Sequence, residues 1–398
     1  MAGLDPAIHL FRKGFLRRLM DTRVKPAYDT LVMWHGALPH GGSSMITDSL
    51  PPAANADHLT GALRKAGVLG DGRVRDVVVK SSRDTIVSHI IRLDLSYDGP
   101  ANDAPRSVIL KIAHSNYAST LWNAGRQEVA FYTEVAPLMS AHLTPRCFEG
   151  SWNAETHAWH LLLEDLTDSH HIATVWPLPP TFKHSKLIVR ALASAHAEWW
   201  DHPRLGNSVG AWLDTEVMNQ IMQQFAEHFG RFADQVGDRL PDERRDLYHR
   251  LIDAAPRLTQ RYHSRRNVTI AHGDAHVWNF LLPQDPARND VRLFDFDQWR
   301  INVGSHDLAY MMALQWYPDR RRLMERPLLD CYHETLLAHG VRGYDRRALD
   351  EDYRRSVLWH ITNPVWQWTA GIPPVIWWNN LERIFMAVDD RGCRELLD

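Results

Sequence analysis

Two short stretches of the sequence are the most informative about the fold, TIAHGDAHVWN at residues 269–279 and VRLFDFD at residues 291–297. In each, an apolar run typical of a buried strand leads into acidic residues. Asn279 follows Asp274 by five positions, and Asp295 ends the second apolar run. Phosphoryl transfer from ATP needs a carboxylate that orients the attacking hydroxyl and accepts its proton, and an amide oxygen and a second carboxylate that hold Mg²⁺. The pattern therefore predicts a catalytic base at Asp274 and Mg²⁺ ligands at Asn279 and Asp295.

Two histidines beside Asp274 allow a different chemistry. His272 and His276 are four positions apart, as in helical zinc motifs of metal hydrolases. However, Gly273 lies between strand-like and polar residues, where a helix is unfavourable, and no third ligand is obvious apart from His306. We therefore interpret both histidines as hydrogen-bonded supports of the loop.

An apolar strand upstream, SVILKIA at residues 107–113, carries Lys111. A lysine on such a strand can protect a sheet edge against aggregation. The alternative is a phosphate-binding ammonium held by a carboxylate on the following helix. Glu128 is the natural partner, but spacing alone does not decide between it and Glu134.

The composition limits the classes of protein that fit. The chain has 398 residues, which favours two to three domains or one large two-lobed domain. Its formal charge of −3 gives no reason to expect a nucleic-acid partner. Three widely spaced cysteines argue against a disulfide framework and suit a reducing compartment, so we expect a cytoplasmic protein. No apolar run is long enough to span a bilayer, and we expect neither a membrane nor an obligate protein partner.

Strands dominate the first part of the chain and helices the remainder. We expect an N-lobe at residues 45–166, formed by a small sheet and one main helix, and a mostly helical C-lobe at residues 167–398. The predicted strands are Arg73–Lys80, Thr85–Tyr97, Ser107–Ala113, Arg146–Trp152 and Trp159–Leu163, and the predicted helices include His58–Ala66, Thr120–Val135, Thr181–Trp200, Thr215–Phe232, Pro241–Tyr262, Leu323–His339, Leu349–Trp359 and Asn379–Val388.

Residues 1–44 differ from the rest of the chain. They hold six Lys or Arg residues against three Asp residues and end in a turn-rich stretch before Met45. A targeting peptide and a membrane-surface helix around His9–Met20 are two interpretations. We favour a disordered extension, or translation that starts at Met45.

Several of these segments together resemble a known family. The sequence is similar to the aminoglycoside phosphotransferase-like kinases, and within them to the ecdysteroid kinase-like branch, which neighbours the choline kinases. The resemblance covers about residues 70–390 and rests on VILKIA around Lys111, QEVAFY at 127–132, LTPRCF at 143–148, LLLEDL at 161–166, HGDAHVWN at 272–279, and DFD at 295–297 followed by GSHDLA at 304–309.

The resemblance implies an α+β, protein-kinase-like fold of two lobes that uses ATP and Mg²⁺. By position, Lys111 resembles the phosphate-binding lysine, with Glu128 as its ion-pair partner. The LLLEDL segment resembles the hinge between the lobes, where the backbone at Glu164 and Leu166 would bind adenine. The remaining positions resemble the catalytic base at Asp274, the metal ligands Asn279 and Asp295, the supporting aspartates Asp297 and Asp307, and the packing residue His196.

One segment departs from the kinase pattern. The predicted loop Lys80–Thr85 has no glycine where kinases usually have a flexible cover over the phosphates. Backbone N–H groups of Ser81 and Ser82 could still bind the nucleotide. The departure keeps open a nucleotide-binding pseudokinase without turnover.

The phosphate acceptor is expected to be a small molecule with a hydroxyl group. The C-terminal region is rich in tryptophan and carries basic clusters at residues 320–322 and at Arg342, Arg346 and Arg347, whereas a polycationic aminoglycoside would need acidic groups. We therefore favour an apolar or amphipathic hydroxyl compound. A choline-type amino alcohol is the next candidate, because tryptophan rings bind quaternary ammonium groups. An aminoglycoside kinase remains a further alternative.

Overall fold

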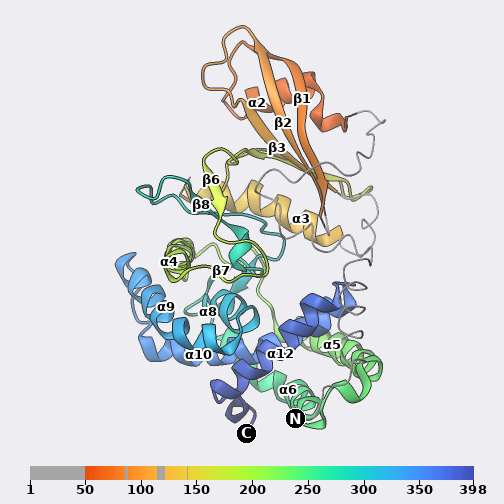
Figure 1. Cartoon of the computed structure of the whole chain (residues 1–398), viewed down its shortest axis with the longest axis vertical. Coiled ribbons are helices and arrows are strands. Elements are labelled where there is room, and N and C mark those ends of the chain that lie inside the picture. Colours follow the sequence, from red (N-terminus) through yellow and green to blue (C-terminus); the bar gives the residue numbers. More distant parts are fainter. Residues whose placement is uncertain (1–49, 86–87, 114–121, 141) are drawn as a thin grey trace, which may run out of the picture.

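The N-lobe is built around one antiparallel sheet (Figure 1). The computed structural model describes residues 50–85, 88–113, 122–140 and 142–398. The strands are β1 (Arg73–Asp84), β2 (Ser88–Asp98), β3 (Ser107–Ala113), β4 (Cys147–Trp152) and β5 (Trp159–Glu164). They pair in the order β1-β2-β3-β5-β4, so that β3 lies at the centre of the sheet.

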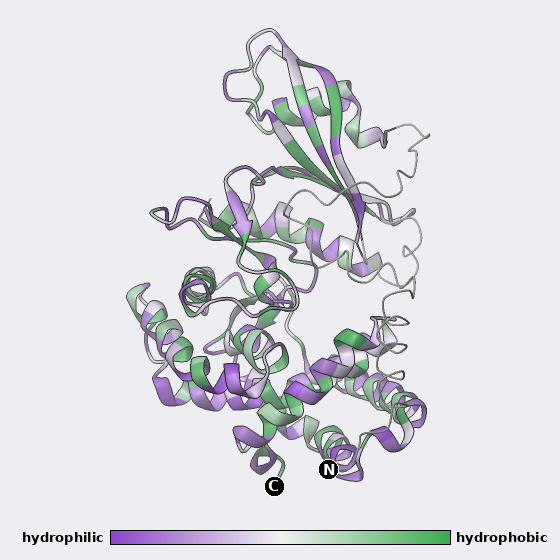
Figure 2. Ribbon diagram, in the orientation of Figure 1, coloured by the Kyte–Doolittle hydropathy of each residue, from purple (hydrophilic) through white to green (hydrophobic). Residues whose placement is uncertain are grey.

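The alternation of side chains along β3 gives the sheet two different faces. Val108 and Leu110 pack with helix α2 (Ala56–Lys65), whereas Ile109 belongs to the larger core on the face of helix α3 (Trp122–Ala130). Figure 2 shows the matching alternation of hydrophilic and hydrophobic residues along the long strands. Lys111 follows the same period as Ile109 and therefore points to the α3 side.

The predicted loop Lys80–Thr85 is wrong. Strand β1 continues to Asp84, which pairs with His89 on β2, and Ser82 hydrogen-bonds the His89 ring at 2.8 Å. Beyond Asp84, the N–H of Thr85 donates to the carbonyl of Ser88 at 2.7 Å. An edge strand tolerates such a polar run because one side of it stays in water.

The C-lobe is mostly helical, with two small sheets beneath the N-lobe (Figure 1). Its α-helices are α4 (Phe182–Glu198), α5 (Thr215–Val236), α6 (Asp242–Leu258), α7 (Gln260–His263), α8 (Ser305–Ala309), α9 (Pro318–Ala338), α10 (Arg346–Trp359), α11 (Asn363–Thr369) and α12 (Pro374–Asp390). Its strands are β6 (His170–Ile172), β7 (Thr269–Ala271), β8 (Phe280–Pro283), β9 (Arg292–Leu293) and β10 (Arg300–Asn302). The α+β fold with a β-rich N-lobe and a helical C-lobe is thus confirmed.

Helices α9 and α12 begin five residues earlier than predicted, each with proline at its first position. Proline is favoured there because its fixed φ suits a helix and the missing N–H would have no partner in the first turn. Among the described residues, no helix is long and apolar enough to cross a bilayer. The predictions for residues 1–44 lie outside the described residues.

Candidate active site

The loop after β7 turns sharply at Gly273. This residue has φ of +83°, and a Cβ atom there would lie 2.1 Å from the backbone oxygen of Gln298. No residue with a side chain fits without moving that backbone. The turn places Asp274 directly beyond the end of the strand.

The carboxylate of Asp307, on α8, fixes the backbone of this turn. Its carboxylate accepts hydrogen bonds from the backbone N–H groups of His272, at 2.6 Å, and Gly273, at 2.9 Å. The His196 ring lies 3.1 Å from the same carboxylate, and Tyr332 in turn contacts that ring. Burial opposes ionisation of Asp307, yet the hydrogen bond from His196 holds its pKa well below its usual range. A buried, charged acceptor therefore fixes the backbone that carries Asp274.

Asp274 and Asn279 lie close together, as their spacing predicts. The Asn279 amide donates to the backbone oxygen of Asp274 at 2.9 Å and to its carboxylate at 3.3 Å. His276 Nε2 lies 3.5 Å from the Asp274 carboxylate. Tyr310, in the helical turn Tyr310–Leu314 that follows α8, also hydrogen-bonds the Asp274 carboxylate. The His272 ring contacts the backbone oxygen of Phe294 at 2.9 Å and supports the loop.

Lys111 joins the two lobes. Its Nζ lies 2.7 Å from Oε2 of Glu128 on α3 and 2.6 Å from Oδ1 of Asp295. Although burial lowers the pKa of Lys111, the two carboxylates raise it above its ordinary value, so the ammonium stays charged. Glu134 is exposed, and the structure selects Glu128 as the partner.

The second acidic stretch adds two carboxylates to the same place. Asp295 has φ of +67°, a left-handed conformation that is strained for a residue with a side chain. Burial, together with Asp295 and Asp274, raises the pKa of Asp297 well above its usual value. Three carboxylates and one amide thus meet beside a single ammonium, and this excess of oxygen donors suits a hard divalent cation.

One cavity of about 1170 Å³ connects these residues with an aromatic chamber in the C-lobe. Lys111, Asp274, Asn279, Asp295 and Asp297 all line it. Its far wall is largely apolar and is formed by side chains that include Trp212, Met222, Phe225, Trp359, Trp366 and Ile376.

Four predicted nucleotide-binding residues do not reach this cavity. The described residues of the β1–β2 hairpin that line the cavity are Arg83, Thr85, Ser88 and Ile90, and Ser81 and Ser82 are not among them. Glu164 and Leu166 are absent as well. The Glu164 N–H is instead engaged with the backbone oxygen of Arg146 at 2.8 Å.

The cavity also contains residues that no sequence motif predicted. Arg83, at the end of β1, faces Asp295 across the cavity. Trp212 and Arg265 line the acceptor side, where the guanidinium lies 5.1 Å from the indole centroid. Tyr310 could have been suspected only from its place one turn after Asp307.

The tryptophans of the C-terminal region have two different roles. Trp359 and Trp366 line the cavity. Trp368 and Trp377 instead pack edge-on against Phe232 in the core. The tryptophan-rich composition of this region therefore serves both the cavity wall and the core.

The basic clusters expected near the acceptor are structural. Arg321 and Arg322 both pair with Asp390, and Arg346 pairs with Asp330 at 2.8 Å. None of these arginines lines the cavity among the described residues. These arginines form ion pairs with aspartates on neighbouring helices, and their clustering in the sequence does not reveal this role.

The two-lobed fold and the convergence of Lys111, Asp274 and Asp295 define a small-molecule kinase. The chain belongs to the ecdysteroid kinase-like family, whose sequence model matches residues 82–199 and 202–341. No curated protein sequence matches the chain.

Solved structures resemble the chain at low sequence identity. A Ralstonia eutropha JMP134 protein assigned as an aminoglycoside phosphotransferase has 11% identity and a TM-score of 0.50, over 85% of this chain and 98% of that one. Choline kinase from Cryptosporidium parvum Iowa II has 12% identity and a TM-score of 0.47, over 81% and 90%. Ethanolamine kinase from Plasmodium vivax has 9% identity and a TM-score of 0.46, over 78% and 81%. The first likeness supports the fold, and the two lower scores add nothing to the argument.

Proposed function

We propose that the protein transfers the γ-phosphate of ATP, with Mg²⁺, to a hydroxyl group of an apolar or amphipathic small molecule. The observation that carries this proposal is the single cavity that joins Lys111, Asp274 and Asp295 to an aromatic chamber. Phosphate donor and acceptor can therefore meet at one carboxylate.

Each polar residue of the cluster has a role in this proposal. Lys111, which Glu128 holds in place, would bind the phosphates. Asn279 and Asp295 would hold Mg²⁺, which supplies charge neutralisation on the phosphates when bound, and Asp297 would support them. Asp274 would accept the proton of the acceptor hydroxyl as its oxygen bonds to the γ-phosphorus and the bond to the ADP oxygen breaks. Adenine contact by the Glu164–Leu166 backbone is left out of the proposal, because neither residue lines the cavity.

The chamber favours an uncharged acceptor. Its walls are tryptophan, phenylalanine, methionine and isoleucine side chains, and burying apolar surface stabilises a complex by roughly 25 cal/mol per Å². Arg265 and Arg300 also line the cavity and would repel a cation. The acid on this side, Asp214, caps helix α5 by accepting from the N–H of Val217 at 2.9 Å.

These features weigh against the two alternative substrates. A polycationic aminoglycoside would meet two guanidinium groups and few carboxylates on the acceptor side. A choline-sized alcohol would fill little of a cavity whose volume exceeds the usual range of about 300–1,000 Å³ for small-molecule sites. The pseudokinase alternative is disfavoured because the lysine, the aspartates and the asparagine all converge.

The test is ADP release from Mg-ATP in the presence of three acceptor sets: hydroxylated steroids and other apolar alcohols, choline and ethanolamine, and kanamycin. We expect stimulation by apolar alcohols. Asp274→Asn should lower this turnover by at least about 100-fold, the usual contribution of a general base. The matched control is Asp238→Asn, at an exposed position in the α5–α6 connection, which should leave turnover unchanged.

Two outcomes would contradict the proposal. Phosphate transfer to kanamycin alone would exclude the acceptor class. Turnover that Asp274→Asn leaves unchanged would exclude the mechanism, provided that circular dichroism shows a folded variant.

A further inference from the structure

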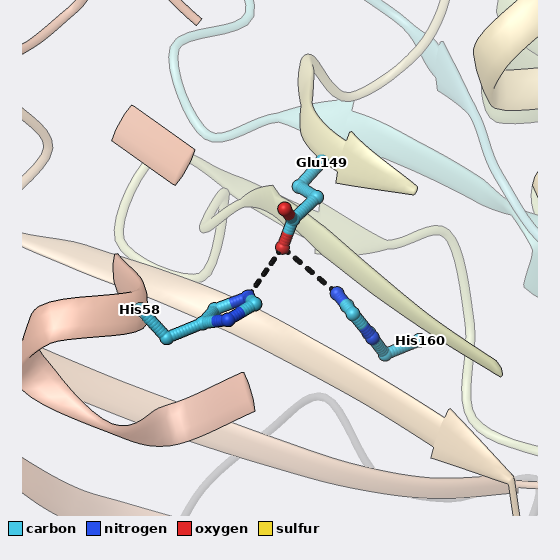
Figure 3. A group of neighbouring side chains, drawn as sticks. All are labelled: His58, Glu149 and His160. Atoms are coloured by element: carbon cyan, nitrogen blue, oxygen red, sulfur yellow. Dashed lines mark hydrogen bonds and ion pairs between the residues drawn. The ribbon is translucent and has the colours of Figure 1, made fainter. Parts of the chain in front are cut away.

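Three metal-ligating side chains converge in the N-lobe, away from the cavity. His58 lies on α2, Glu149 on β4 and His160 on β5, and Figure 3 shows both rings pointing at one carboxylate. Glu149 Oε2 lies 2.6 Å from Nε2 of His58 and 2.8 Å from Nε2 of His160. Their ligand atoms lie within 4.8 Å of one another.

The sheet separates this cluster from the phosphate-binding side. His160 pairs with Ile112 across β5 and β3, whereas Lys111 pairs with the next residue, Leu161. Because successive side chains point to opposite faces, His160 and Lys111 are on opposite sides of the sheet. None of the three residues lines the cavity, so the proposed phosphotransfer leaves them without a role.

We propose that His58, Glu149 and His160 form a Zn²⁺ site that fastens helix α2 to strands β4 and β5. Two imidazole nitrogens and one carboxylate oxygen are a common zinc ligand set, with water completing the tetrahedron. Ligand atoms bound to zinc at about 2.0–2.2 Å lie roughly 3.3 Å apart in a tetrahedron. The contacts of 2.6 and 2.8 Å therefore need to open by less than about 1 Å, which side-chain rotation can supply.

The donor set favours zinc over the common alkaline-earth ions. Mg²⁺ and Ca²⁺ prefer oxygen ligands, whereas imidazole suits Zn²⁺ and its neighbours in the first transition series. Glu149 already contacts both imidazoles through one oxygen, so its carboxylate is placed to serve as the anionic ligand. The side chains are partly exposed, 36% for His58, 24% for Glu149 and 17% for His160, which leaves an entry path for the ion.

The site would stabilise the folded chain. His58 is separated from Glu149 by 91 positions, so a bound ion would connect a helix near the start of the described chain to the far edge of the sheet. An ion that binds only the folded state raises the free energy of unfolding by RT ln(1 + c/Kd), where c is the ion concentration, so the unfolding temperature rises as c exceeds Kd.

The experiment uses the whole chain, stripped with EDTA and then titrated with ZnCl₂ in a calorimeter. Co²⁺ serves as the spectroscopic substitute, because its visible absorption reports tetrahedral coordination. We expect one saturable site and a higher melting temperature with Zn²⁺. His58→Gln keeps an N–H donor for Glu149 but loses the ligand, and should weaken binding by at least about 100-fold, since even indirect partners of a metal are worth 10- to 100-fold.

Two further variants make the test specific among 23 histidines. Glu149→Gln should abolish the same site, and His339→Gln, at an exposed position after α9, should retain it. Absence of saturable binding to the folded native chain would overturn the proposal. Equal Zn²⁺ stoichiometry and affinity in the native chain and in folded His58→Gln would also overturn it, because the ion would then bind elsewhere.

Discussion

Lys111 and Asp295 are separated by 184 positions in the sequence, yet Nζ of the lysine lies 2.6 Å from Oδ1 of the aspartate. The contact connects the central strand of the N-lobe to the end of the second acidic stretch in the C-lobe. Both residues line the cavity, and their ion pair is a charged contact between the two lobes.

Lys111→Met tests the strength of this contact. The substitution leaves Glu128, which is 2% exposed, without its cation. Breaking a buried pair by removing one partner costs about 3–5 kcal/mol, and we expect the lower end because Asp295 is 33% exposed. Urea unfolding measures the loss, and ADP release should fall with it.

The matched control for that variant is Lys80→Met. Lys80 pairs with Asp94 at 3.0 Å, but both side chains are largely exposed. Such a pair is worth at most about 1 kcal/mol. Equal destabilisation by the two substitutions would show that the Lys111 cluster has no special role.

Gly273→Ala tests the turn that carries Asp274. The added methyl group would collide with the backbone oxygen of Gln298 in addition to the strain of a positive φ. Gly371 has φ of +74° with open space around it, so Gly371→Ala isolates the strain alone. We expect about 1 kcal/mol of destabilisation for Gly371→Ala and at least twice that for Gly273→Ala, measured by urea unfolding. Similar values for both would mean that the backbone at Gln298 moves freely.

The sequence predicts the chemistry of the site better than its boundaries. Asp274, Asn279 and Asp295 are recoverable because a fixed spacing follows buried strands, and such local patterns are readable without tertiary contacts. The partner of Lys111 was left open between Glu128 and Glu134, since both lie on one helical segment and only packing decides which is buried. The prediction that Ser81 and Ser82 lie in a loop was wrong, because a polar edge strand and a polar loop have similar amino-acid compositions.

The walls of the cavity and the zinc cluster could not be predicted from the sequence. Trp212, in the segment before α5, and Trp366, on α11, line the same cavity, but nothing in the sequence distinguishes them from core residues such as Trp368. His58, Glu149 and His160 come from three elements whose order in space depends on the sheet topology. Contacts between segments far apart in the sequence create both the cavity wall and the zinc cluster.

Trp366→Ala tests the apolar chamber. Trp366 lines the cavity and its ring lies 5.8 Å from that of Phe225. We expect the substitution to weaken binding of the apolar fluorescent probe 8-anilinonaphthalene-1-sulfonate by roughly tenfold, as loss of one large aromatic contact removes more than 1 kcal/mol. Trp368→Ala removes a ring packed against Phe232 and should lower stability with little change in probe affinity. The reverse pattern would place the binding surface elsewhere.

His360 gives the protein a defined sensitivity to acid. The side chain is 1% exposed and contacts the backbone oxygen of His306 at 2.9 Å. Burial lowers its pKa to about 4, whereas an unfolded chain binds the same proton near pH 6.5. Between these values the unfolded state holds more protons than the folded state, so stability falls as the pH is lowered through this window. At pH 5.0 the loss of stability from this group relative to pH 7.5 is about 2 kcal/mol.

Urea unfolding of His360→Gln should show a correspondingly smaller loss of stability between the two pH values, while exposed His339→Gln should behave as the native chain. An equal loss in His360→Gln and the native chain would assign the acid sensitivity to other groups.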